Sequence, residues 1–144
     1  MKRIAIVLCS FLMLCAAASA KDKKEKIQQT DLPVKSQEFI ANSFAQSLVK
    51  SVVKMTSEQQ VETFLVTFKD KSKIEFDMVG AWSSVWTKKG EVSDRIAPVR
   101  VRSVLRTQYA GKKIVAADND GLHYHFVLDD NTEVRINALG EEMK

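Results

Sequence analysis

The two histidines, His123 and His125, are the side chains of this sequence whose type and spacing come nearest to a chemical site. Residues two apart on a β-strand point to the same face, so both imidazoles would lie opposite the side that carries Tyr124 and Phe126. With Glu133 as a third ligand, they could begin a zinc site. The sequence supplies no further cluster of ligands, so we favour a solvated sheet face and predict no metal and no other cofactor.

Other catalytic patterns are missing from the sequence. Both cysteines, Cys9 and Cys15, lie in the first 20 residues, and no serine stands in a nucleophile-elbow pattern. None of the five glycines belongs to a phosphate-binding loop. Asp118 and Asp120 do not have the spacing of a calcium-binding EF-hand and are typical of turns. We therefore predict that the protein is not an enzyme.

Residues 1–20 are typical of a secretory signal peptide. A positively charged start is followed by an apolar run that is shorter than the roughly 20 residues of a membrane-spanning helix, and the segment ends on Ala-Ser-Ala at Ala20. We expect cleavage after Ala20 and a periplasmic or secreted chain that begins at Lys21. One alternative is an uncleaved membrane anchor, which the well-formed small-residue cleavage site disfavours. The other is lipidation of Cys15, disfavoured because the preceding Leu14 is not small.

The chain that remains after cleavage is nearly balanced in charge. Two of the 22 basic side chains, Lys2 and Arg3, leave with the signal peptide, so 20 remain against 18 acidic ones, a net charge of +2. This balance gives no reason to expect a nucleic-acid partner. No later apolar run is long enough to cross a bilayer, so we expect no membrane insertion after cleavage.

The rest of the chain divides into a leader and two similar halves. The charged segment 21–30 can bury little apolar surface, so we expect a flexible leader. Proline, aromatic, aliphatic and glycine positions in the half at about 31–90 recur 65 or 60 positions later in the half at about 91–144. This similarity predicts one supersecondary unit used twice, with halves that superpose. The clearest matches are Pro33 with Pro98, Phe44 with Tyr109, Ile74 with Val134, Phe76 with Ile136, and Gly80 with Gly140.

Each half is expected to contain a helix followed by antiparallel strands. Pro33 and Pro98 fit the first turn of a helix, where a missing N–H costs nothing. Strict alternation of apolar and polar residues then predicts strands, and polar turns separate them. We therefore expect an α+β fold, a tandem repeat that forms one antiparallel sheet with both helices on one face. The predicted core contains Ile40, Phe44, Phe64, Ile74, Phe76, Met78, Leu105, Tyr109, Tyr124 and Ile136.

Trp82 and Trp86 follow the first predicted hairpin. Four positions apart on a strand without a bulge, they would share one face. We expect both to pack in the core, since aromatic side chains dominate small cores. The alternative is that one of them is exposed as an anchor for a partner.

Two stretches of sequence resemble a known family. The hairpin KDKSKIEFDMVGAW at 69–82 and its echo DDNTEVRINALGE at 129–141, with the Leu32-Pro33 helix start, resemble the PepSY-like family over about residues 27–144. The resemblance implies small exported proteins, also described as β-lactamase-inhibitor-like, with tandem helix-plus-sheet units and no established enzymatic activity. β-Lactamase inhibitors of similar architecture bind with a concave sheet face and projecting loops. They carry disulfides that this chain lacks, so only the fold is transferred.

The sequence thus favours an exported, non-catalytic binding module. Its partner would be a protein or peptide of the cell envelope, bound in an inhibitor-like way and without a metal, on the sheet face that no helix is left to cover. The alternatives are a merely hydrated face, a small-ligand or envelope-stress sensor with a cleft between the halves, and, last, a hydrolase. The predicted face carries Thr63, Leu65, Thr67, Lys73, Glu75, His123, His125, Val127, Glu133 and Arg135.

Overall fold

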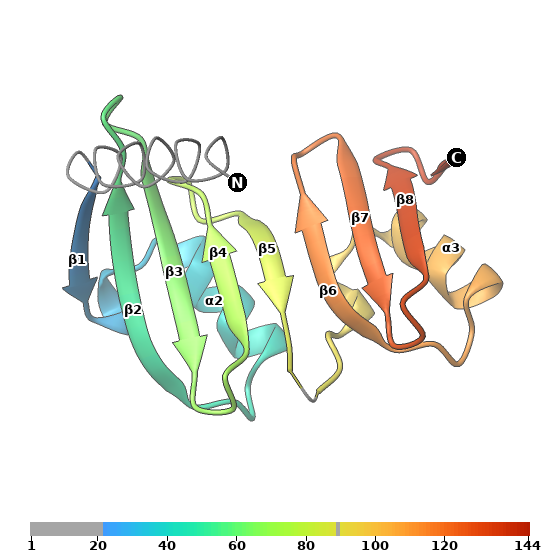
Figure 1. Ribbon diagram of the computed structural model, residues 1–144, viewed down its shortest axis with the longest axis horizontal. Coiled ribbons are helices and arrows are strands. Elements are labelled where there is room, and N and C mark those ends of the chain that lie inside the picture. Colours follow the sequence, from blue (N-terminus) through green and yellow to red (C-terminus); the bar gives the residue numbers. More distant parts are fainter. Residues whose placement is uncertain (1–21, 89) are drawn as a thin grey trace, which may run out of the picture.

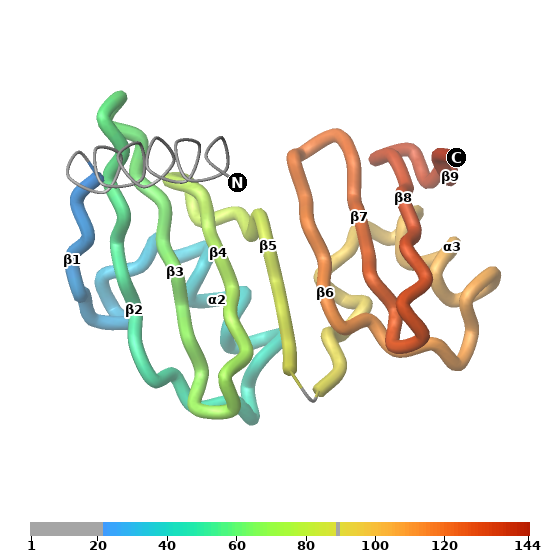
Figure 2. The backbone as a smooth tube through the Cα atoms, in the orientation of Figure 1, coloured from blue at the N-terminus to red at the C-terminus, as the bar shows by residue number. Residues whose placement is uncertain are grey.

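The computed structural model describes residues 22–88 and 90–144, which form one open antiparallel sheet with helices on a single face. The predicted signal peptide lies outside the described residues. The strands are hydrogen-bonded in chain order from β1 to β9, and Figures 1 and 2 show both α-helices behind the sheet. In chain order the elements are β1 (Lys23–Ile27), the 3₁₀ helix η1 (Gln29–Asp31), α2 (Val34–Ser43), β2 (Val49–Thr56), β3 (Glu62–Phe68), β4 (Lys73–Phe76), β5 (Trp82–Trp86), the 3₁₀ helix η2 (Asp94–Ile96), α3 (Val99–Gln108), β6 (Ile114–Asn119), β7 (His123–Leu128), β8 (Glu133–Asn137) and β9 (Glu142–Met143).

Both helices begin directly after a proline and bury a narrow apolar stripe. Pro33 and Pro98 are the cap residues directly before α2 and α3, one position earlier than the first-turn place that the sequence predicts. Ile40 on α2 and Leu105 on α3 are buried against the sheet. Across residues 22–88 and 90–144, no helix has both the length and the apolar character that a membrane crossing requires.

Alternation along the strands separates a helix-covered face from an open face. In β3, every second residue from Phe64 to Phe68 is buried, and the residues between are half-buried. The prediction that Phe64, Phe76, Tyr124 and Ile136 are core residues is confirmed. Phe44 and Tyr109, which follow the two helices, are partly buried against the same core. The helices therefore cover the side of the sheet that the sequence predicts.

Met78 does not follow the predicted alternation. The strand β4 ends at Phe76, and the next residues form the turn to β5. Met78 lies in this turn and is 59% exposed. Its assignment to the core was wrong because the alternation was extended two residues beyond the end of the strand.

The turns after β4 and β8 use the same hydrogen bonds. The carboxylate of Asp77 accepts from the backbone N–H groups two and four residues ahead, at 3.0 and 2.9 Å. The side-chain oxygen of Asn137 does the same at 3.0 and 2.9 Å. Gly80 and Gly140 each donate a backbone N–H to the residue that begins its turn. These turns match, whereas the superposition of the complete halves stays a prediction.

The segment expected to be a flexible leader instead contains the edge strand β1. It pairs with β2 from Lys23 opposite Thr56 to Ile27 opposite Val52. Four of its five side chains are exposed, so side-chain composition gave no reason to expect order. The strand is held by main-chain hydrogen bonds to β2, which are independent of side-chain burial. Its lysines also suit an edge, since charged edge strands resist pairing with other chains.

Trp82 and Trp86 lie on opposite faces of the sheet. The register between β4 and β5 shifts by one residue between Glu75 and Phe76, which makes Ser83 the extra residue of a β-bulge. Trp82 therefore faces the helices and is 7% exposed, whereas Trp86 reaches the open face and is 43% exposed. The expectation that both pack in the core was wrong for Trp86, and the alternative of one exposed tryptophan is the observed arrangement.

Candidate functional site

The open face is built from two rows of cross-strand neighbours. Residues directly opposite one another on paired strands have Cβ atoms about 4.5–5.5 Å apart, so each row is a continuous surface. We call them the Ser84 row and the Trp86 row. The Ser84 row runs through Val53, Leu65, Glu75, Ser84, Asp118, His125, Arg135 and Met143. The Trp86 row runs through Ser51, Thr67, Lys73, Trp86, Ala116, Val127 and Glu133.

All ten residues of the predicted face are exposed or half-buried and lie opposite the core. Eight of them belong to the two rows, while Thr63 and His123 lie one step further along β3 and β7. The sequence missed the central members Ser84 and Trp86 because their places depend on the register of β5. It missed Asp118 because that residue was assigned to a turn, whereas it lies on β6. The only signal was a tryptophan pair separated by two serines and a valine, which fits a strand with or without a bulge.

Trp86 is the most prominent apolar group near the centre of the open face. It lies between Lys73 on β4 and Ala116 on β6, and Val127 follows beyond Ala116. A hollow of about 290 Å³ lies beside it, lined by Leu65, Lys73, Glu75, Ser84 and Trp86. A half-exposed tryptophan with apolar and charged neighbours is typical of the residues that anchor protein partners.

The two histidines contact carboxylates of neighbouring segments. Nδ1 of His125 lies 3.8 Å from Asp118, and its Nε2 lies 3.6 Å from Glu133. Nδ1 of His123 lies 3.1 Å from Asp120. Within the part of the chain that the structure describes, no three His, Cys, Asp or Glu side chains are grouped so that they could hold a metal ion.

Asp120 is expected to make the stability of the protein depend on pH in acid. Its carboxylate accepts from the backbone N–H groups of Leu122 and His123, at 2.9 and 2.7 Å. These bonds, and the contact with the His123 ring, lower the pKa of Asp120 from 3.8 to about 2. The pKa of Asp120 is lower in the folded protein than in the unfolded one, so the ionised carboxylate stabilises the fold. This stabilisation is fully present at pH values above the pKa of the unfolded state, and it is lost as the pH falls through the pKa of the folded state.

The measurement is urea unfolding at several pH values between about 5 and 2. The Asp120→Asn variant cannot lose a negative charge, so its free energy of unfolding should fall less over this interval than that of the wild type. Equal losses in the two proteins would show that the Asp120 carboxylate does not contribute to acid sensitivity.

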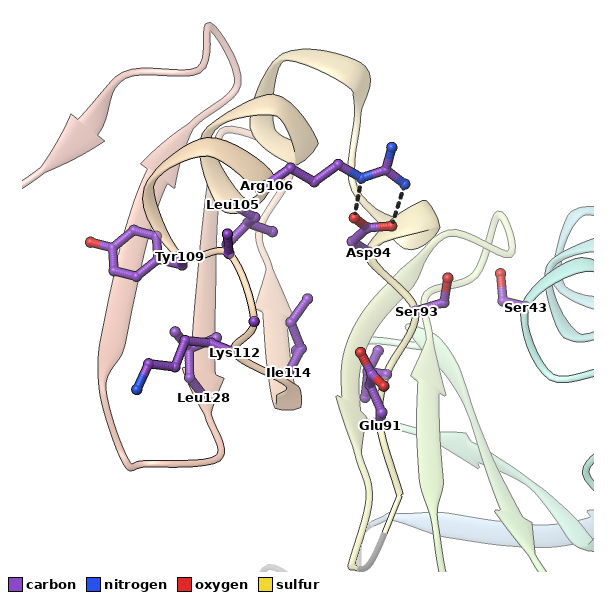
Figure 3. A pocket seen from close by; sticks show the side chains of 13 residues that line it. Ser43, Glu91, Ser93, Asp94, Leu105, Arg106, Tyr109, Lys112, Ile114 and Leu128 are labelled. Atoms are coloured by element: carbon purple, nitrogen blue, oxygen red, sulfur yellow. Dashed lines mark hydrogen bonds and ion pairs between the residues drawn. The ribbon is translucent and has the colours of Figure 1, made fainter.

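A second candidate site lies on the helix side. A cavity of about 550 Å³ is lined by Ser43 at the end of α2, the segment Glu91–Asp94 before α3, and residues of α3 that include Arg106. Figure 3 shows these side chains and the two bonds from Arg106 to Asp94, at 2.6 and 3.1 Å. The bond to Arg106 lowers the pKa of Asp94, and the same bond raises the pKa of Arg106. Of its lining residues, Ser43 belongs to the half at about 31–90 and all the others belong to the half at about 91–144, so the cavity lies mainly within the second half rather than in a cleft between the halves.

In the part of the chain that the structure describes, the fold and the open face define a small α+β module whose nine-stranded sheet is covered by helices on one side only. Residues 62–141 match the family described as "Putative beta-lactamase-inhibitor-like, PepSY-like". The match covers more than half of the chain, and the chain belongs to this family. The resemblance found in the sequence is thereby confirmed.

Solved structures of three Bacteroides proteins share the fold. A "putative periplasmic protein from DUF2874 family" of Bacteroides vulgatus has 24% identity and a TM-score of 0.77, covering 85% of this chain and 95% of that one. A "putative calcium-regulated periplasmic protein" of Bacteroides thetaiotaomicron has 26% identity and a TM-score of 0.75, with coverages of 84% and 94%. A "putative periplasmic protein of unknown function" of Bacteroides vulgatus has 24% identity and a TM-score of 0.74, with coverages of 85% and 97%.

The descriptions of the three similar structures give a location rather than an activity, and one of them gives the function as unknown. All three structures are described as periplasmic, in agreement with the periplasmic or secreted location predicted from the sequence. Neither the family description nor these three descriptions names a catalytic activity. A search of curated proteins gave no match.

Proposed function

We propose that this protein is a non-catalytic binding module of the cell envelope that engages a protein or peptide through its open face, in an inhibitor-like way. One observation carries the proposal: Trp86 is 43% exposed near the middle of a face that no helix within residues 22–88 and 90–144 covers. Tryptophan is enriched among the few residues that supply most of the binding energy of an interface. Leu65 and Val127 extend the apolar surface, and charged residues surround it, as in a typical interface.

The proposal includes the export and the internal repeat inferred from the sequence. Residues 1–20 would act as a cleaved signal peptide that delivers the domain to the envelope. The halves at about 31–90 and 91–144 would be two copies of one unit. The matching turn bonds of Asp77 and Asn137 support this repeat. Two such units, joined edge to edge by β5 and β6, would create a face wide enough for a protein partner.

The second candidate is a small-ligand or envelope-stress sensor that uses the cavity on the helix side. The cavity of about 550 Å³ favours it, since small-molecule sites are commonly clefts of about this size. The relative from Bacteroides thetaiotaomicron is described as calcium-regulated, and a regulated role by analogy would suit a sensor. Variants distinguish the two functions: substitutions on the open face should impair a binding module, whereas substitutions in the cavity should impair a sensor.

The test is affinity capture from the native envelope fraction with Trp86→Ala. The amount of each partner protein retained by the variant should be roughly tenfold or more below that retained by the wild type. The reason is that a central tryptophan commonly contributes about 2 kcal/mol or more to the free energy of binding. Met78→Ala is the matched control, because it also removes an exposed apolar side chain but lies in the turn after β4. Quantitative mass spectrometry measures the retained proteins.

The same capture is repeated with a chelator. Retention should be unchanged, since the proposed contact uses no metal. Partners that bind Trp86→Ala as well as they bind the wild type would exclude the open face, and partners lost on chelation would exclude the metal-free mode.

A further inference from the structure

We infer that the segment of the partner that docks on the open face presents a basic side chain beside an apolar one, with the basic group over Ser84 and the apolar group against Trp86. This inference rests on the proposed function and adds the chemistry of the partner. Its basis is the arrangement of charge around the hollow beside Trp86.

Two carboxylates flank Ser84 in register. Glu75 on β4 lies opposite Ser84 on one side, and Asp118 on β6 lies opposite it on the other. Neighbouring strands are about 4.8 Å apart, so the two acidic residues are separated by roughly 10 Å across the short serine side chain. That spacing leaves room for a guanidinium or ammonium group between them. The bulge at Ser83 creates this juxtaposition, because without it Ser84 would face the helices.

These carboxylates are available to a partner. Among the described residues, the carboxylate of Glu75 takes part in no hydrogen bond or ion pair. The side chain of Asp118 is 65% exposed, and its contact is the His125 ring at 3.8 Å. Both carboxylates lie near the centre of the open face, on the strands at either side of β5. They provide charge complementarity for a cation.

The indole ring of Trp86 adds an aromatic surface beside Ser84 and the two carboxylates. It follows Ser84 by two positions on β5, so both side chains reach the open face. The hollow beside it is lined by Glu75 and by Leu65, which combines a carboxylate with apolar surface. An arginine or lysine can pair with the acids while it lies against the indole, and its apolar neighbour can contact Leu65. Lys73, the neighbour of Trp86 within the Trp86 row, repels a second cation and so favours one orientation of the segment.

The probe is a library of random peptides displayed on phage and selected against the protein. Three variants are compared with the wild type: Trp86→Ala, the double change Glu75→Gln with Asp118→Asn, and the control double change Glu38→Gln with Asp22→Asn. The control removes the same charge from exposed positions on α2 and directly before β1. Individual peptides are then titrated at low and high salt.

We expect the selected peptides to contain arginine or lysine next to an aliphatic or aromatic residue. Trp86→Ala should weaken the binding of these peptides roughly tenfold or more. The Glu75/Asp118 variant should weaken their binding about tenfold at low salt and should show a flatter salt dependence. The control variant should bind them as the wild type does. Peptides that need Trp86 but lack a basic residue would overturn the inference and leave the proposed function standing. Peptides that bind all variants equally, or a selection that enriches nothing, would overturn both.

Discussion

Replacing Phe76 with alanine is expected to lower the free energy of unfolding by about 3–5 kcal/mol. Phe76 is fully buried in β4, on the face covered by α2. The ring of Phe39 meets it edge-on with centroids 5.6 Å apart, and Phe64 lies opposite it on β3. Truncation would remove these contacts and leave a cavity in a region where helix and sheet are both held by aromatic packing. Urea unfolding followed by circular dichroism measures the loss.

The matched control is Met78→Ala, two positions further along the chain. Met78 is 59% exposed in the turn, so its truncation should change the free energy of unfolding by less than about 1 kcal/mol. A loss below about 1 kcal/mol for Phe76→Ala as well would mean that β4 presents its other side to the helices, which would reverse the two faces of the sheet.

The two faces could be predicted from the sequence because a strand alternates with a period of two. Once Phe64 and Phe126 are assigned to the core, Leu65 and His125 must lie on the other side, whatever the pairing of the strands. The helix positions were predictable for a similar reason, since a proline at the start and apolar residues at helical spacing act locally. No information about distant parts of the chain was needed for either inference.

The remaining features depend on pairing, which alternation does not encode. The charged side chains of β1 predict disorder, but the strand is ordered by main-chain hydrogen bonds to β2, which side-chain composition does not reveal. The bulge at Ser83 is likewise a property of the β4–β5 register. Because that one extra residue decides which face receives Trp86, the centre of the candidate site could not be derived from the sequence. Asp118 was interpreted as a turn residue because no strand was predicted over 114–119, whereas it lies on β6 and pairs with Ser84.

Replacing Gly80 with alanine is expected to cost about 2–4 kcal/mol, combining a strained backbone with overpacking. Gly80 lies in the turn between β4 and β5 with φ at +90°, a conformation that an L side chain rarely adopts. A Cβ there would lie 2.8 Å from Cβ of Pro33 and 2.9 Å from Oγ of Ser36. Ser36 is fully buried and donates its hydroxyl to the Gly80 carbonyl at 3.1 Å, so the start of α2 has little freedom to move away.

Gly121→Ala separates the two contributions. Gly121 has nearly the same φ, +92°, but a Cβ there would meet nothing within 4 Å. It should therefore lose only the backbone part, about 1 kcal/mol, in the same urea unfolding experiment. Equal losses for the two variants would show that contact between the turn and the helix start adds nothing. A larger loss for Gly80→Ala would show that α2 holds the turn from which β5 begins, and β5 carries Ser84 and Trp86 to the open face. On that result, the packing of one glycine against a helix start helps to set the position of the candidate binding surface.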